Sequence, residues 1–135
     1  MENKKVKWFI YTVLVGLIPV FARLLVWGVT QKGTVSMLAT SDFIAFGLIL
    51  HISNINEIEH TNDNRSWKTI QNGASILFIA LYSVLFALVM LSEGLPALID
   101  AEVIKICVIS LAVISLTISF SVFHRISSIQ QTGGN

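Results

Sequence analysis

The stretch LILHISNINEIEH, residues 48–60, gathers the side chains most able to do chemistry. His51, Glu57, Glu59 and His60 are of types that bind metals or carry protons. On a helix, His51 and Glu57 are six residues apart, and Glu59 and His60 are adjacent, so neither pair shares a face. We therefore predict that the chain binds no metal. We expect His51 to be a hydrogen-bonded packing or interface residue, with a role in a proton path as the alternative.

The isoleucines in the same stretch suggest what it does structurally. Ile52, Ile55 and Ile58 follow a helical stripe, and His51 and Asn54 fall toward another face. This pattern predicts an amphipathic continuation of a membrane helix into water, ended by the turn sequence TNDN at 61–64. Its polar end could dock a partner. The candidate docking residues are Asn54, Asn56, Glu57, Glu59 and His60.

Arg23 and Asp42 are charged residues inside or near long apolar runs. If the two runs are consecutive antiparallel spans, both charges lie at similar depth, where an ion pair would lower the cost of each. We expect a structural role for both, either as this pair or separately. Separately, Arg23 would extend to the interface and Asp42 would cap a helix. The alternative is a role in transport or gating.

Small residues recur four apart in the last two apolar runs. Ser83 and Ala87 form one such pair, and Ser115 and Ser119 form another. Small side chains let membrane helices approach closely, and hydroxyls can bond between helices. We predict helix packing, within or between chains, at these four positions. The alternative is a serine-lined aqueous path, which would need several copies of so small a chain.

Composition places the chain among membrane proteins. It has 135 residues, of which 54% are hydrophobic and 13% charged, about half the charged fraction of a typical soluble domain. The net charge of +1 gives no basic field, so we expect no direct nucleic-acid partner. No Ser/His/Asp arrangement or phosphate-binding glycine loop is recognisable. We predict that the protein is not an enzyme and has no catalytic residues and no cofactor.

The apolar runs predict an all-α, polytopic membrane protein, with one transmembrane domain over residues 1–135. The expected spans are about 6–30, 35–55, 70–91 and 103–123, packed as a compact antiparallel bundle. The second span is the least apolar; without it there would be three crossings. Residues 56–69 would form a cytoplasmic helix extension and loop, and 126–135 a short tail.

Charge bias predicts the orientation of the four spans. Six of the nine Lys and Arg residues lie before span one, between spans two and three, or after span four. They are Lys4, Lys5, Lys7, Arg65, Lys68 and Arg125. Positive residues collect on the cytoplasmic side, so both termini are expected there, in a bacterial inner membrane.

Two functions fit this architecture. The first is a homo-oligomeric subunit in the lipid bilayer that anchors, or signals to, a soluble cytoplasmic partner. The second is a small ion-conducting or membrane-permeabilising protein, such as a channel, holin or effector. A basic start and four apolar helices, the second ending FGLILHISNINEIEH, resemble the small membrane subunits of bacterial antiphage systems of the Kiwa type. That resemblance implies an oligomeric sensor that recruits a soluble DNA-binding effector, hence a part in antiviral defence.

Overall fold

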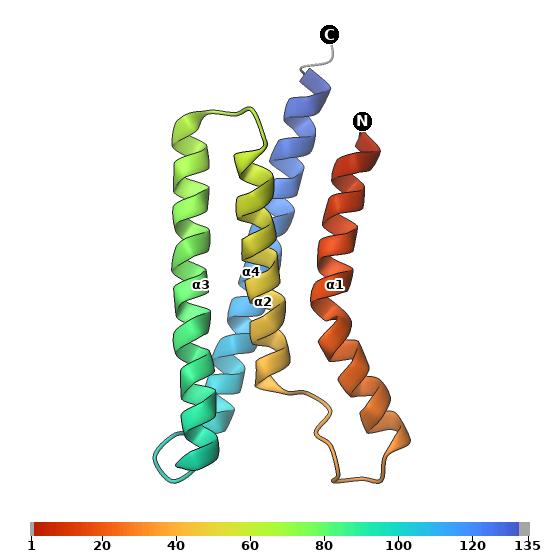
Figure 1. Ribbon diagram of the computed structural model, residues 1–135, viewed down its shortest axis with the longest axis vertical. Helices are drawn as coiled ribbons and strands as arrows, with labels where there is room; N and C mark the ends of the chain where they lie inside the picture. The colour runs from red at the N-terminus through yellow and green to blue at the C-terminus, as the bar shows by residue number, and fades with distance from the viewer. Residues whose placement is uncertain (1, 133–135) are drawn as a thin grey trace.

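Four helices run alternately up and down through the molecule (Figure 1). This computed structural model describes residues 2–132, and the side chains of residues 6–129. The helices are α1 (Glu2–Val29), α2 (Thr40–Glu59), α3 (Arg65–Gly94) and α4 (Ala101–Thr132). The chain is all-helical over the described residues, as the sequence predicts. The N-terminus, the α2–α3 loop and the end of α4 lie at one end of the bundle.

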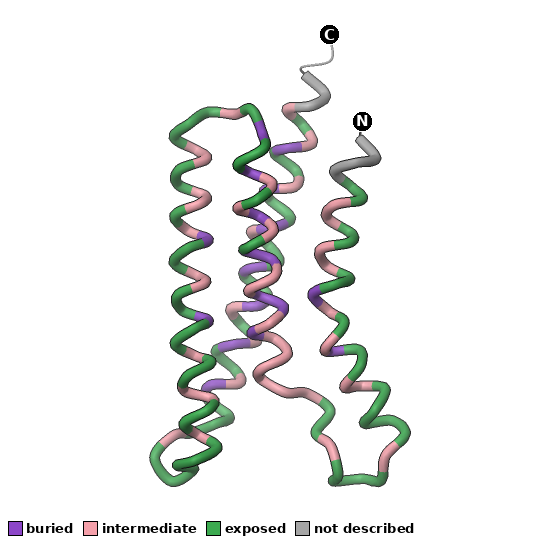
Figure 2. Tube along the Cα trace, in the orientation of Figure 1, coloured by how far each residue is buried: buried purple, intermediate pink, exposed green. Residues whose placement is uncertain are grey.

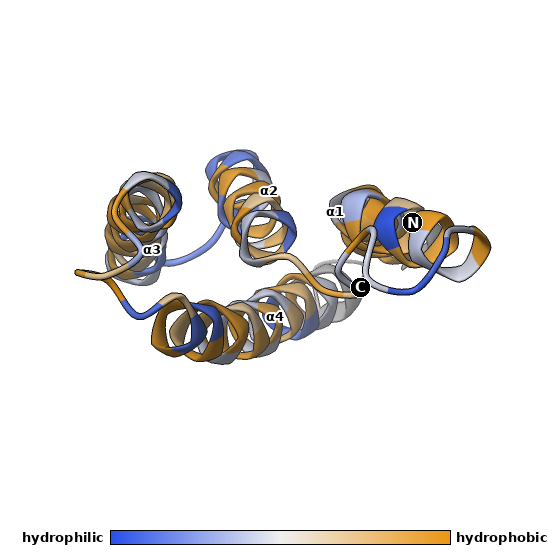
Figure 3. Cartoon of the chain, turned by 90° about the horizontal axis from the view of Figure 1, so that it is seen from below, coloured by the Kyte–Doolittle hydropathy of each residue, from blue (hydrophilic) through white to orange (hydrophobic). Residues whose placement is uncertain are grey.

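The central helix is α2, the shortest of the four. Seen along the bundle, α3, α2 and α1 stand side by side, and α4 crosses one face of this row (Figure 3). Accordingly α2 contacts all three other helices, whereas α1 and α3 have no contact with each other within the described residues. Every side chain that ties the bundle together must therefore reach α2 or α4.

Two helix boundaries differ from the ends of the expected spans. The second helix begins at Thr40 instead of residue 35, because the segment before it turns: Gly33 adopts a left-handed φ of 88° and Ala39 is extended. The last helix continues to Thr132, so the expected tail at 126–135 is helical as far as the structure describes it. The third helix begins at Arg65, where Asn64 Oδ1 accepts a hydrogen bond from the Ser66 amide and caps it.

Three helical segments are long and apolar enough to cross a membrane. They are Val6–Val29, Arg65–Gly94 and Ala101–Ile129, and α2 is not among them. The outer surface of these helices is apolar: Ile76, Leu77 and Val84 on α3 are each about 60% exposed. Figure 2 shows burial concentrated on α2 and on the sides of the other helices that face it. Exposed apolar surface on this scale fits a membrane protein.

The apolar core lies in small clusters along α2. Ile44 packs with Tyr82, Ile104 and Val108, and a separate cluster surrounds Leu50. At Gly47 the ring of Tyr82 from α3 packs directly against the backbone of α2. A Cβ atom there would lie 2.2 Å from Tyr82 Cζ, so only glycine admits the tyrosine ring. This contact brings the Tyr82 hydroxyl to the centre of the bundle.

Candidate functional site: a buried polar core on α2

His51 lies at the centre of a hydrogen-bonded network between three helices. Its Nδ1 is 3.2 Å from Ser75 Oγ on α3, and its Nε2 is 2.8 Å from Ser115 Oγ on α4. Ser115 Oγ is also 2.8 Å from the Tyr82 hydroxyl, and the Phe78 ring stacks on the imidazole at 4.8 Å. All four hydrogen-bonding side chains are fully buried. A neutral imidazole donates at one nitrogen and accepts at the other, so both ring nitrogens of His51 are satisfied.

Asn54 extends this network one turn along α2. Its Nδ2 donates a 2.9 Å hydrogen bond to Ser119 Oγ, and both side chains are buried. Its Oδ1 is buried and accepts no hydrogen bond from the side chains that the structure describes. We call His51, Asn54, Ser75, Tyr82, Ser115 and Ser119 the polar core. Because buried polar groups are costly when unpaired, this arrangement fixes which faces of α2, α3 and α4 meet.

Ser53 makes the corresponding contact with α1. Its hydroxyl accepts a 2.8 Å hydrogen bond from Trp8 Nε1 and lies 2.9 Å from Thr12 Oγ1. These hydroxyl and indole groups are partly buried, at the end of the bundle that holds the N-terminus. Together with the polar core, this contact gives α2 side-chain hydrogen bonds to all three of its neighbours.

The structure divides the isoleucine stripe of residues 51–60. Ile58 is fully buried, whereas Ile52 is 58% exposed, and His51 and Asn54 point into the bundle. In a soluble protein, isoleucine side chains are usually buried in the core, away from water. Around a membrane bundle the apolar residues face outward and polar residues are placed inside, where they find partners. Asn54 is therefore not accessible to a docking partner, since its side chain is buried and bonded to Ser119.

The polar core holds one pairing that occurs in enzymes. A serine hydroxyl 2.8 Å from an imidazole is the contact through which a base activates a nucleophile. In a catalytic triad the second imidazole nitrogen bonds to a carboxylate, whereas here it bonds to the Ser75 hydroxyl. The Ser115 hydroxyl also bonds to the Tyr82 hydroxyl. Ser115 is fully buried. The geometry supports a structural hydrogen-bonding role for these groups.

Arg23 and Asp42 form an ion pair between α1 and α2. Arg23 Nε donates to Asp42 Oδ2, and the two side chains are 30% and 13% exposed. The pair lies at the opposite end of the bundle from the N-terminus, where α1 leads into α2. The sequence left open whether Arg23 and Asp42 pair or act separately, and in the structure they pair.

A second group of charges lies at the α2–α3 loop. Asp63 accepts hydrogen bonds from Arg125 Nε at 2.8 Å and from its Nη2 at 3.4 Å. The guanidinium also lies 4.5 Å from the centre of the Trp67 ring. The hydrogen bond from Arg125 lowers the pKa of the Asp63 carboxyl below its ordinary value. These contacts join the loop to the last turns of α4.

The remaining docking residues lie at the end of α2. Asn56, Glu59 and His60 are exposed, and their spacing of three and four places them on one side of the helix. His60 Nδ1 lies 2.7 Å from the Asn56 carbonyl oxygen. Glu57 is partly buried, and its carbonyl accepts a hydrogen bond from Thr61 Oγ1. Asn56, Glu59 and His60 therefore form the accessible surface of this helix end.

The two small-residue pairs have different surroundings. Ser115 and Ser119 face α2 and belong to the polar core. Ser83 and Ala87 are exposed on the outer side of α3, and the Ser83 hydroxyl donates to the Ile79 carbonyl of its own helix. The first pair packs helices within one chain. The second could pack helices only between chains.

Comparison with known proteins found no relative of this chain: no protein-family model, curated protein or solved structure matches it. Nothing in these comparisons bears on the resemblance to Kiwa-type membrane subunits. Among the described residues, no group of three or more His, Cys, Asp or Glu side chains could hold a metal ion.

Sequence reasoning did not identify the partners of His51. Ser75 and Tyr82 are seven residues apart, which is two helical turns, and thus share one face of α3. His51 and Asn54 share a face in the same way, as do Ser115 and Ser119. The signal was three apolar helices, each carrying a pair of polar residues at helical spacing. These pairs mark the polar faces of the three helices, but which pairs meet depends on how the helices pack.

Proposed function

We propose that the protein is an oligomeric membrane subunit that binds a soluble cytoplasmic partner through the exposed end of α2. The observation that carries this proposal is the polar surface of Asn56, Glu59 and His60 at the end of the most firmly held helix. Hydrogen bonds from α1, α3 and α4 fix α2 in position. A partner bound at its end would therefore meet a pre-organised surface.

The proposal includes α2 as a fourth membrane span. Its polar residues lower its hydropathy, but those at positions 51, 53 and 54 make hydrogen bonds to neighbouring helices. Interior polar groups with partners are compatible with a membrane helix, and residues 40–55 of α2 would supply about 24 Å of helix before the docking residues begin. Lys7, Arg65, Lys68 and Arg125 lie toward the end of the bundle with the N-terminus. By the positive-inside rule this end is cytoplasmic.

Association between copies is proposed through the outer side of α3. Ser83 and Ala87 present small side chains, four residues apart, on a surface that the rest of the chain leaves open. Such a surface allows two membrane helices to approach closely. If the resemblance to Kiwa-type subunits reflects ancestry, the assembled protein recruits a DNA-binding effector in antiphage defence.

The partner proposal is tested with the full chain, affinity-tagged and purified from membranes of its native host. A soluble protein should co-purify in fixed stoichiometry, and Asn56→Ala with His60→Ala should abolish its recovery. The matched control is Gln31→Ala with Lys32→Ala, in the loop at the other end of the bundle, which should retain it. Purification of the chain without any soluble protein, or equal loss in both variants, would refute the proposal.

Association is tested by disulfide crosslinking in membranes, in a Cys107→Ala background because Cys107 is exposed. Ser83→Cys should yield crosslinked dimers. Leu81→Cys, at nearly the same depth but on another side of α3, is the control and should yield few. Equal crosslinking at both positions would indicate random collision and would count against this interface.

The interior of one chain gives little support to ion conduction. On α2, the buried apolar residues Ile44, Phe46 and Leu50 separate the Asp42 ion pair from the polar core. The polar side chains also bond to one another instead of lining an open path. Purified protein in liposomes should therefore show no ion flux above empty liposomes, and a clear flux would favour the channel hypothesis.

A further inference from the structure

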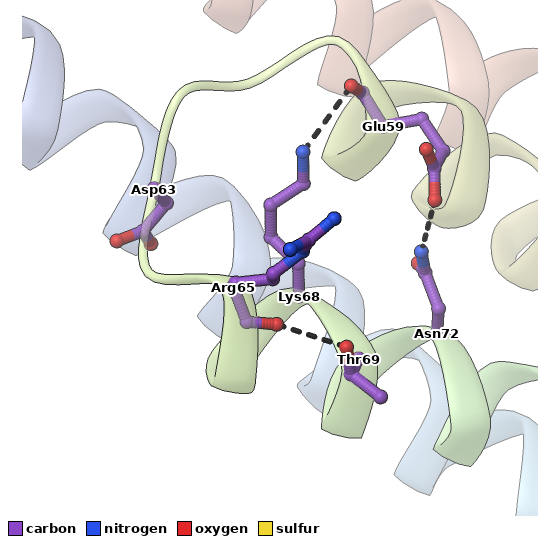
Figure 4. Close-up of a pocket in the computed structure, with 6 residues that line it drawn as sticks. All are labelled: Glu59, Asp63, Arg65, Lys68, Thr69 and Asn72. Carbon is purple, nitrogen blue, oxygen red and sulfur yellow. Dashed lines mark hydrogen bonds between the residues drawn. The ribbon is translucent and has the colours of Figure 1, made fainter.

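A polar pocket lies beside the α2–α3 loop, at the point where α3 begins (Figure 4). Its volume is about 410 Å³. The end of α2, the loop and the first two turns of α3 supply its lining, which consists of Glu59, Asp63, Arg65, Lys68, Thr69 and Asn72. Because Arg65–Gly94 is one of the helices able to cross a membrane, a pocket at Arg65 lies at the depth of lipid headgroups.

The charges in this pocket are not paired with one another. Asp63 is held by Arg125, outside the pocket, and also interacts with the charge of Lys68. Lys68 Nζ donates to the Glu59 carbonyl oxygen, at 3.4 Å. No carboxylate among the described side chains forms an ion pair with Arg65 or Lys68. Figure 4 shows both cationic side chains reaching toward the space between the loop and α2. Two adjacent cations that form no ion pair with a described carboxylate can bind an anion such as phosphate.

Glu59 provides a complementary charge on the α2 side of the pocket. One carboxylate oxygen, Oε1, accepts a 2.6 Å hydrogen bond from Asn72 Nδ2. The side chain is exposed, so its other oxygen can accept from a ligand. The pocket thus combines an anion site on α3 with a cation site on α2. This charge pattern matches a zwitterion that carries a phosphate and a protonated amine.

An apolar hollow adjoins the pocket and shares Arg65 and Thr69 with it. Its volume is about 440 Å³, and Ser66 and Ile70 complete its lining. Ile70 is 68% exposed, and the outer side of α3 continues with the exposed apolar residues Ile76 and Leu77. A ligand with an apolar chain next to its phosphate would cover this surface.

We propose that the pocket binds the headgroup of a phospholipid that carries a primary amine, as in phosphatidylethanolamine. Arg65 and Lys68 bind the phosphate oxygens, Glu59 accepts hydrogen bonds from the ammonium group, and an acyl chain lies over Ile70. Basic pockets at the ends of membrane helices bind lipid headgroups by the same chemistry. The inference goes beyond the proposed function, because it requires no soluble partner.

The test is native mass spectrometry of the full chain in detergent, titrated separately with three lipids of identical acyl chains. Phosphatidylethanolamine should bind about tenfold more tightly than phosphatidylcholine, whose phosphate is the same but whose quaternary amine has no N–H to donate. It should also bind more tightly than phosphatidylglycerol, which has no cation for Glu59. Equal binding of the three lipids, or preference for phosphatidylglycerol, would overturn the assignment of the amine.

Variants separate the two charge sites. Arg65→Gln with Lys68→Gln should weaken phosphatidylethanolamine binding by about tenfold or more. The control, Lys32→Gln with Lys105→Gln, removes the same charge outside the pocket and should change binding less than about twofold. Glu59→Gln should abolish the preference over phosphatidylcholine. Equal effects of the two double variants would contradict the site. The thermal midpoint of each variant shows that its fold is intact.

Soluble phosphoethanolamine distinguishes the lipid from a free metabolite. Under the proposal it competes only weakly, because it lacks the acyl chain, and Ile70→Asn weakens lipid binding without changing the affinity for phosphoethanolamine. Displacement of the lipid at equimolar phosphoethanolamine would show that the acyl chain contributes nothing. That outcome would overturn the assignment of a lipid.

Discussion

The two helices α2 and α3 pack against each other but distribute polarity in opposite ways. In α2, seven of 20 residues are buried, and they include His51 and Asn54. In α3, 30 residues long, only Ser75 and Tyr82 are buried, and both carry hydroxyl groups. Beyond its first two turns, most of the exposed residues of α3 are apolar. The less apolar helix is therefore the one inside, because its polar groups have partners there.

This difference explains why hydropathy identifies α3 as a membrane span and not α2. Hydropathy measures what a helix would expose if it stood alone. For α3, the surface exposed by the isolated helix and the surface exposed in the bundle are almost the same. For α2 the two exposed surfaces differ. Its polar groups are buried in the bundle, where three neighbouring helices supply hydrogen bonds that lipid cannot. The comparison rests on the polar core, so changes there should have the largest effects.

Replacing His51 should have the greatest effect on stability. His51→Ala removes two hydrogen bonds, leaves buried serine hydroxyls without a partner and opens a cavity beside Phe78. We expect a loss of about 2–5 kcal/mol in the free energy of unfolding, measured by denaturant titration in micelles. The control is Ile52→Ala at the next residue, which is exposed and should cost less than about 1 kcal/mol. Similar losses for both would mean that α2 is not oriented as described.

A side chain at Gly47 should separate α2 from α3. In Gly47→Ala the new Cβ would overlap the Tyr82 ring, and we expect a loss of about 1–3 kcal/mol. Gly73→Ala is the control on α3. It meets no atom within 4 Å and should be neutral or stabilising by up to about 1 kcal/mol. Thermal unfolding followed by circular dichroism measures both, and a tolerated Gly47→Ala would show that the two helices pack less closely.

Removing a buried hydroxyl from α4 should cost more stability than removing an exposed one. Ser115→Ala removes a buried group that contacts both His51 and Tyr82, and should cost about 1–2 kcal/mol. Ser110→Ala removes an exposed hydroxyl that donates only to the Ile106 carbonyl of its own helix, and should change stability by less than about 0.5 kcal/mol. Equal effects in thermal unfolding would show that the polar core does not distinguish inside from outside.

The smallest effect is expected at the pair of Asp63 and Arg125, in which the Arg125 side chain is 44% exposed and the Asp63 side chain 11%. The pKa of Asp63 is lowered in the folded protein, so its contribution is present above the unfolded pKa and lost as pH falls through the folded value, below about 3.8. The difference in thermal midpoint between wild type and Asp63→Asn should be small near pH 6 and should shrink further on acidification into this range. A difference that does not change with pH would show that the ion pair contributes nothing.

Elements were easier to predict than faces. Apolar runs locate all four helices, because length and composition suffice for that. The Arg23–Asp42 pair was one of the arrangements open from the sequence, since two spans joined at one end bring their charges to similar depth. The start of α2 did not follow, because the left-handed Gly33 and extended Ala39 depend on local turn geometry. The apolar residues from 35 to 39 could equally have continued a helix.

The orientation of residues 51–60 could not be obtained from their own pattern. Ile52 and His51 occupy adjacent positions, and either could face the core. Which one does depends on whether lipid or water surrounds the helix and on which helix lies beside it. Ser115 becomes the partner of His51 only after α4 is known to cross α2, and no local spacing contains that information.

The hydrogen-bond partners of α2 come late in the chain. His51 and Asn54 bond to residues 64 and 65 positions further on, so α2 leaves the ribosome well before Ser115 and Ser119 are made. During that interval its polar groups have no partners on α4, and in the proposed fourth span a bilayer would offer them none. Biogenesis of such a span should therefore retain α2 in a protected setting, such as the insertion machinery, until α4 arrives. Any nascent chain that ends before α4 needs this protection.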